Sequence, residues 1–209
     1  MQNQTQTAVQ NGIPVEDILV VPTQALFASG SWQGLKGLGE IDLSSYLDLI
    51  QSNAQFLSRP EMETDLQYKQ IIPYLIFKYQ DKYFLMQRAD KASESRLRSK
   101  YSLGIGGHIR ADDMQGKSIF DWARREFAEE VEYQGNVQVE MLGVLNDDSN
   151  PVGQVHLGLV LLLTGDSDQI KVSSELKSGM LLTLSECENF AAQMENWSAL
   201  VFQFLKSRI

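Results

Sequence analysis

Three glutamates near the middle of the chain have the spacing and the chemistry of a cation site. Residues 125–133 read REFAEEVEY, and in a helix Glu126 would share one face with Glu129 and Glu130, three and four positions on. Like charges at such spacings cost roughly 0.2–0.5 kcal/mol per pair. The stretch is therefore either a solvated charged face or a ligand set for a hard divalent cation. Arg125 can reach forward one turn to Glu129, or across to a loop, and orient the acids.

A glycine-rich segment before this stretch favours the cation site. GIGGHI spans residues 104–109, after an expected strand and before the acidic helix. Gly106 and Gly107 carry no side chain, so the backbone there can approach a metal ion or a phosphate closely. A backbone carbonyl in this segment can complete the oxygen shell of a metal ion.

The order of strand, glycine pair, loop and REFAEE helix resembles the Nudix hydrolases. The family signature is G-x5-E-x7-R-E-U-x-E-E-x-G-U, where U is an aliphatic residue, and Phe127 stands at the first U. The resemblance covers residues 68–209, and the N-terminal stretch is similar to a bacterial subgroup labelled predicted phosphoesterases. The residues that match the conserved positions are Gly107, the pair Arg125-Glu126 and the pair Glu129-Glu130.

The loop between the glycine and the arginine departs from the signature. It is four residues longer than in the family, with the insertion around ADDMQG, and Lys117 stands where the signature has a glutamate. Asp112 or Asp113 in the longer loop can replace that acid. The end of the signature also differs, because Glu132 replaces the late glycine and Tyr133 the last aliphatic residue. Glycine is the residue best suited to end a helix, so we expect the helix to run on towards Gly135.

The resemblance implies a Mg²⁺-dependent (or Mn²⁺-dependent) pyrophosphohydrolase, or phosphoesterase. Nudix enzymes cleave a nucleoside diphosphate linked to another moiety by attack of water on phosphorus. The implied metal ligands are Glu126, Glu129, Glu130 and the carbonyl of Gly106, and these three glutamates form the catalytic set with Arg125. The proton of the water goes to an acid of this cluster or to one in a later loop, for which the candidates are Glu175, Asp147 and Asp148.

Substrate phosphate is expected at the glycines and at a basic stretch just before them. The candidate residues are Gly106, Gly107, Arg88, Arg96 and Arg98, and the alternative for the arginines is a solvated loop. His108 can touch a phosphate or make only a local hydrogen bond. His156 is expected to be a core or edge residue. Trp122 and Tyr133 can stack a base, but we expect them to serve packing.

Two other functions compete with hydrolysis. A Nudix-fold module that senses a nucleotide without cleaving it is consistent with the changes at Lys117 and Glu132. An isoprenoid diphosphate isomerase shares the fold, but it needs an active-site cysteine and several metal-binding histidines. The chain has only Cys187, His108 and His156, which argues against the isomerase.

Composition limits the partners. The 209 residues carry a formal net charge of −9, which disfavours nucleic acid and anionic membranes as partners. One cysteine excludes an intramolecular disulfide. Residues 1–12 are polar, lack the features of a secretory signal and are expected to be flexible. The longest apolar run, residues 157–163, is too short to span a bilayer as a helix, so we expect a soluble cytoplasmic protein.

Hydrophobic periodicity predicts an α/β fold, a mixed sheet with helices packed against it. The resemblance implies that this fold is a Nudix-like α/β/α sandwich. Residues 1–67 are expected to form an N-terminal α+β extension to a domain of residues 68–209. The extension either caps the site or builds a homodimer. Pro73 should lie near the start of its strand or on a sheet edge. Strands are expected at 18–21, 71–80, 83–90, 138–146 and 155–163, and helices from Asp42 to about Leu57, at 119–132 with Ser118 and Asp121 as caps, and from Ser185 with Glu188 to Leu205.

Overall fold

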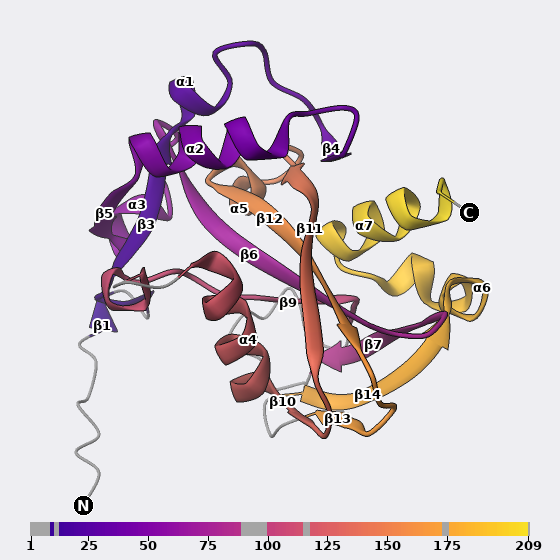
Figure 1. The fold of residues 1–209 in the computed structure, drawn as a ribbon. Coiled ribbons are helices and arrows are strands. Elements are labelled where there is room, and N and C mark those ends of the chain that lie inside the picture. Colours follow the sequence, from indigo (N-terminus) through magenta and orange to yellow (C-terminus); the bar gives the residue numbers. More distant parts are fainter. Residues whose placement is uncertain (1–8, 11–12, 89–99, 115–117, 173–175, 209) are drawn as a thin grey trace, which may run out of the picture.

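One large mixed sheet organises the molecule (Figure 1). The computed structural model describes residues 9–10, 13–88, 100–114, 118–172 and 176–208. Only β6 and β12 pair in parallel, and every other pairing among the described strands is antiparallel. The order across the sheet is β14 (Leu176–Thr183), β7 (Lys82–Arg88), β6 (Tyr68–Tyr79), β12 (His156–Gly165), β11 (Val137–Asn146) and β4 (Gly34–Gly37).

Shorter strands extend this sheet beside β6 and β7. β3 pairs with both β5 and β6, while β8 pairs with β7 and β9 with β6. Their bounds are β3 (Asp17–Pro22), β5 (Gln55–Ser58), β8 (Tyr101–Ser102) and β9 (Gly104–Gly106). Two separate pairs of strands are β1 (Val9–Gln10) with β2 (Ile13–Pro14), and β10 (Val131–Tyr133) with β13 (Ile170–Val172).

Helices cover both faces of the sheet, which confirms the α/β/α sandwich. Side chains alternate along β6, so Leu75 packs on one face and Ile76 on the other. The first face is covered by α1 (Thr23–Leu26), α2 (Leu43–Asn53) and α4 (Ile119–Glu130), and the second by α6 (Leu184–Cys187), η3 (Glu188–Gln193) and α7 (Asn196–Lys206). Short turns of helix complete the fold at α3 (Arg59–Met62), η2 (Ala111–Met114) and α5 (Pro151–Gln154).

Pro73 lies in the middle of the central strand rather than near its start. On one side, β6 pairs with β12 from Gln70 to Tyr79. On the other side, β3 pairs as far as Gln70 and β9 begins at Tyr74. Pro73 falls between these two pairings, at a local edge where a residue without an N–H group is tolerated.

The segment before residue 68 contributes strands to the same sheet. β3 pairs with the start of β6, and β4 pairs with the end of β11. The helix expected from Asp42 begins as predicted, with the Asp42 side chain accepting from the amides of Ser44 and Ser45. It ends at Asn53, earlier than predicted, because Phe56 and Leu57 pair with β3.

The C-terminal segment is divided where one helix was expected. The capping box is formed by Thr183 and Glu186, two residues before the predicted pair Ser185 and Glu188. Met194 then takes an extended conformation, and α7 starts after Glu195, whose carboxylate accepts from the buried hydroxyl of Tyr74 at 2.6 Å. This buried hydrogen bond fixes the break between η3 and α7. No helix in the described ranges is long and apolar enough to span a membrane.

Truncation of a central side chain should measure how far stability rests on the sheet. Leu161 lies in β12 and is fully buried, so Leu161→Ala should lower the free energy of unfolding by about 2–5 kcal/mol in urea denaturation. The control is Leu38→Ala, since Leu38 is 68% exposed and its truncation should change stability by no more than about 0.5 kcal/mol. Equal effects of the two changes would contradict this packing.

Candidate active site

Helix α4 carries the three glutamates, and its start follows the predicted capping box. The Ser118 hydroxyl accepts from the amide of Asp121, and the Asp121 carboxylate accepts from the amide of Ser118. Trp122, Ala123 and Phe127 are buried against the sheet, and the ring of Phe127 stacks on Phe77 in β6 at 5.3 Å between centroids. Packing on this side leaves the acids on a face beside the buried stripe.

The glycine segment approaches α4 closely. β9 pairs with β6, which places Gly107 just beyond the paired strand. A β-carbon on Gly107 would lie 2.6 Å from the carboxylate oxygen Oε1 of Glu126 and 3.3 Å from the ring of Trp122. Glycine is therefore required for the Glu126 carboxylate to rest against this backbone. The predicted neighbours, the glycines and the acidic helix, do lie together.

The helix ends at Glu130, so the expectation that it continues towards Gly135 is wrong. Val131 has φ −136° and ψ 147°, and residues 131–133 form β10. β10 pairs with β13, and Tyr133 packs its ring against Phe77 and Phe127. Strand pairing with a distant segment therefore stops the helix where the family has a glycine. Trp122 and Tyr133 serve packing, as predicted.

Arg125 connects the acids of this face. One end of its guanidinium donates to Glu129 at 2.8 Å, and the other donates to Asp113 of η2 at 2.7 Å. Glu126 Oε2 lies 3.8 Å from the same guanidinium. Both contacts foreseen for Arg125, with the next turn and with a loop, are present.

Glu126 has a raised pKa. Burial raises its pKa to about 7, and the negative charge of Glu129 adds to this, while Arg125 acts in the opposite direction. The side chain of Glu126 is 18% exposed, compared with 58% for Glu129. A carboxylate held among other carboxylates in a partly buried position is a site whose charge a cation would stabilise.

The donor set fits a hard divalent cation by its chemistry. Glu126, Glu129 and Glu130 offer carboxylate oxygens on one helix, and the adjacent glycine backbone leaves room for the approach of a ligand. Across the described part of the chain, no three acidic, histidine or cysteine side chains converge on one point as they stand. Binding by this set requires the carboxylates to rearrange, because Glu129 is bonded to Arg125.

The predicted basic stretch falls largely outside the described residues. Arg96 and Arg98 lie there, as do Lys117 and Glu175. For Arg88 the backbone is described, at the end of β7 opposite Leu176 of β14. The assignment of these arginines to substrate stays a prediction.

The two aspartates named as candidate bases make structural hydrogen bonds after β11. Asp147 is buried and accepts from the backbone and hydroxyl of Ser149 and from Asn150. Asp148 accepts from Lys69, whose ammonium group is buried, at 2.6 Å. These bonds hold the turn that leads into β12.

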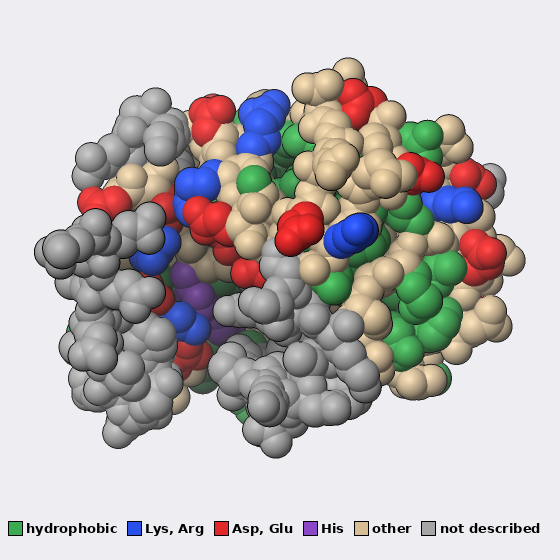
Figure 2. Space-filling model, turned by 90° about the horizontal axis from the view of Figure 1, so that it is seen from below, with side chains coloured by type: hydrophobic (Ala, Val, Ile, Leu, Met, Phe, Trp, Pro, Cys, Tyr) green, Lys and Arg blue, Asp and Glu red, His purple; other side chains and the backbone are tan. Residues whose placement is uncertain are grey.

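The two histidines of the chain lie beside each other, with ring centroids 5.7 Å apart. His108 hydrogen-bonds Gln70 at 2.8 Å, and His156 hydrogen-bonds the carbonyl of Val152 at 2.6 Å. Burial lowers the pKa of His108 well below its usual value, and Arg59 and His156 add to this shift. Figure 2 shows histidine together with basic and acidic side chains on the face seen from below.

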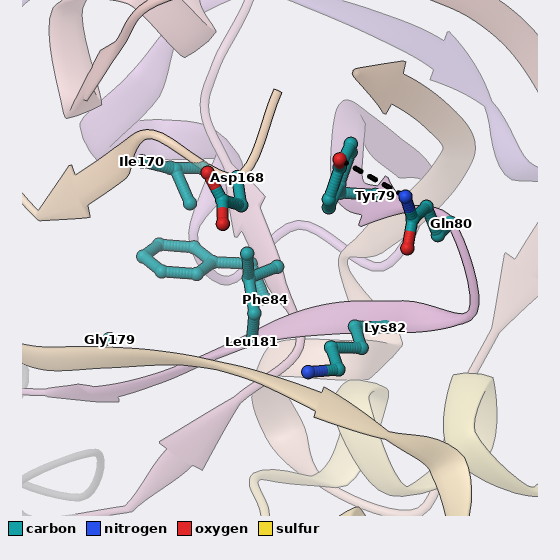
Figure 3. Close-up of a pocket in the computed structure, with 8 residues that line it drawn as sticks. All are labelled: Tyr79, Gln80, Lys82, Phe84, Asp168, Ile170, Gly179 and Leu181. Carbon is teal, nitrogen blue, oxygen red and sulfur yellow. Dashed lines mark hydrogen bonds between the residues drawn. The ribbon is translucent and has the colours of Figure 1, made fainter. Parts of the chain in front are cut away.

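A separate cavity of about 450 Å³ lies at the turn between β6 and β7 (Figure 3). Lys82 and Phe84 of β7 and Asp168 of the loop before β13 point into it. Among the described residues that line it, none is a predicted site residue. The cavity is therefore distinct from the glycine segment and the acidic face of α4.

Comparison with known proteins decides the family. No family model matches the sequence. Protein YmaB of Bacillus subtilis is 31% identical over 205 residues, which cover 91% of this chain and 98% of YmaB. The crystal structure of Tm1382, a candidate Nudix hydrolase, has a TM-score of 0.78 and 29% identity over 93% of this chain and 100% of Tm1382. The chain belongs to the Nudix hydrolase superfamily.

A more distant Nudix structure shares the fold alone. The NUDIX domain of NrtR from Shewanella oneidensis, in complex with ADP ribose, has a TM-score of 0.54 and 13% identity. The match covers 80% of this chain and 99% of that domain. The glycine segment and α4 are the parts of the fold that carry the residues matching the family signature.

The raised pKa of Glu126 predicts how stability depends on pH without divalent cations. The folded chain binds the proton of Glu126 more tightly than the unfolded chain, so stability should fall as pH rises from about 4.5 to about 7. Glu126→Gln removes this group and should raise the melting temperature relative to the original protein more at pH 8 than at pH 5. Thermal melts in EDTA measure the difference, and an identical shift at both pH values would contradict the raised pKa.

Proposed function

We propose that this Nudix hydrolase is a Mg²⁺-dependent pyrophosphohydrolase that cleaves a nucleoside diphosphate linked to another moiety. The observation that carries the proposal is the contact of Glu126 with the backbone of Gly107. It brings the acidic face of α4 to the exposed glycine backbone where a diphosphate and a cation can both approach. The raised pKa of Glu126 supports a cation at this place.

The residues of the chain divide the work as follows. Glu126, Glu129 and Glu130, with the carbonyl of Gly106, would hold a divalent cation. When bound, such a cation neutralises diphosphate charge and lowers the pKa of a bound water. Arg125 keeps the acids in place through its bonds to Glu129 and to Asp113.

The reaction breaks one phosphoric anhydride bond. The oxygen of water forms a bond to phosphorus, and the bridging oxygen leaves with the electron pair of the broken bond. The proton of the water passes to a carboxylate of the α4 cluster or of a later loop. Gly106 and Gly107 give the diphosphate access to the backbone, and Arg88, Arg96 and Arg98 are the proposed cationic contacts.

A small nucleotide-type diphosphate in the cytoplasm is the partner that we propose. The net charge of −9 supports a small substrate over nucleic acid, since cations rather than a basic surface would neutralise its phosphates. A homodimer built by the N-terminal extension is part of the proposal. The mass of the full-length protein in gel filtration with light scattering tests it.

A second candidate function is a Nudix-fold module that binds such a diphosphate without cleaving it. The arrangement of Arg125 favours this candidate, because its guanidinium donates hydrogen bonds directly to the carboxylates of Glu129 and Asp113. An arginine that remained there would compete with a divalent cation for the acids.

A substrate panel separates the two functions. We expect the full-length protein to release product from at least one of nucleoside triphosphates, nucleotide sugars including ADP-ribose, dinucleoside polyphosphates and NADH. The release should require Mg²⁺ and stop in EDTA, because the acids act with a cation. Tight binding in calorimetry without turnover of any compound would instead establish the module.

The last glutamate of α4 tests the assignment of the acids. Glu130→Gln should lower kcat by about 100-fold or more, since removal of even a supporting partner of a metal site costs 10–100-fold. The melting temperature should stay within a few degrees, because Glu130 is not a core residue. Glu132→Gln is the matched control, exposed two residues further on, and should keep full activity. A fully active Glu130→Gln variant would refute the assignment.

A further inference from the structure

We propose that Asp113 is a positioning residue of this active site, acting on the α4 glutamates through Arg125. The inference rests on the proposed function, because it names a further residue of the same metal-binding face. The family signature has an acid eight positions before its arginine, where this chain has Lys117. Asp113 stands twelve positions before Arg125 in the inserted loop and contacts it directly.

Both carboxylate oxygens of Asp113 are used, and in different directions. Oδ1 accepts from the Arg125 guanidinium at 2.7 Å, and Oδ2 accepts from the backbone amide of Arg110 at 2.9 Å. The side chain is only 10% exposed, so the bond to Arg125 is partly shielded from solvent. Asp113 thus ties α4 to the backbone that immediately follows the glycine segment.

The consequence for the acids follows from the shape of the guanidinium. Arg125 divides its two ends between Asp113 and Glu129, with Glu126 at 3.8 Å. Without Asp113, the released end is free to turn onto Glu126 or Glu129. Such pairing would neutralise the carboxylates that a divalent cation needs. Asp113 therefore keeps one end of the Arg125 guanidinium away from the carboxylates of Glu126 and Glu129.

The N-terminal segment holds Asp113 in its place. The amide of Leu19 in β3 donates to the carbonyl of Ile109 at 2.8 Å, and Ile18 forms a bridge with Arg110. Glu16 lies 3.9 Å from the Arg110 guanidinium, a weak contact because the Arg110 side chain is 54% exposed. The backbone pairing thus fixes the loop between Gly107 and Asp113. The segment before residue 68 is in this sense a support of the active site.

The role of Asp112 differs from that of its neighbour. Asp112 is exposed in the same turn of η2, whereas the side chain of Asp113 is only 10% exposed and is bonded to α4. Asp112→Asn is therefore a matched control for Asp113→Asn, with the same change of charge one residue away.

The test measures Mn²⁺ affinity by isothermal titration, together with kcat and melting temperature. Asp113→Asn should weaken Mn²⁺ binding by about 10–100-fold, as for other outer partners of metal ligands, and keep its melting temperature within a few degrees. Asp112→Asn should bind as the original protein does. Unchanged Mn²⁺ affinity in Asp113→Asn would overturn the inference, even if hydrolysis by the original protein is established.

A double-variant cycle shows whether Asp113 acts through Arg125. Arg125→Gln and the pair Asp113→Asn/Arg125→Gln should bind Mn²⁺ equally, because the effect of Asp113 vanishes without its partner. Additive losses would refute a role through Arg125. Arg125→Lys keeps the positive charge but loses the two-ended guanidinium that bonds both Asp113 and Glu129, so its Mn²⁺ affinity should fall as that of Asp113→Asn does. This variant tests the inference if Asp113→Asn does not fold.

Failure of the hydrolase and failure of this inference give different results. An original protein that binds Mn²⁺ but cleaves no substrate refutes the proposed hydrolysis, and the affinity ratios still decide the role of Asp113. An original protein that binds no Mn²⁺ at millimolar concentration overturns both.

Discussion

The close approach of α4 to the backbone at Gly107 is the constraint on which the site depends. A β-carbon there would lie 2.6 Å from Glu126 Oε1, so a side chain at this position would displace the carboxylate. The helix is kept in place by the stacking of Phe127 on Phe77. The glycine strand is kept in place by β6, where the ring of Tyr74 lies 2.4 Å from where a β-carbon of Gly104 would be. The sheet therefore fixes both partners of the contact.

The charges around this contact suit it to bind a cation. The close approach buries Glu126 among other acids and raises its pKa. Keeping these carboxylates together therefore destabilises the charged form of Glu126. Arg125 offsets part of the repulsion among the acids by its ion pairs with Glu129 and Asp113. The carboxylates therefore lie close together, repel one another and are only partly neutralised. Such a group is suited to bind a divalent cation together with a diphosphate.

The features with local causes could be predicted from the sequence. The start of α4 and its acidic face follow from the cap at Ser118 and from helical spacing. The end of α4 could not be predicted, because Val131 is drawn into pairing with β13, far along the chain. The sequence also could not distinguish Asp112 from Asp113 as the replacement for the missing signature acid. Only the folded loop brings Asp113 to Arg125. The register of the C-terminal cap was missed because a threonine and a serine two residues apart both fit the pattern.

The central claim is that the acids of α4 bind a divalent cation beside the glycine segment. Anomalous diffraction from crystals soaked in Mn²⁺ tests it most directly. The account predicts a peak bonded to at least two of Glu126, Glu129 and Glu130, next to the carbonyl of Gly106. A map at saturating Mn²⁺ with no peak on this face, and with Arg125 still bonded to Glu129, would contradict it.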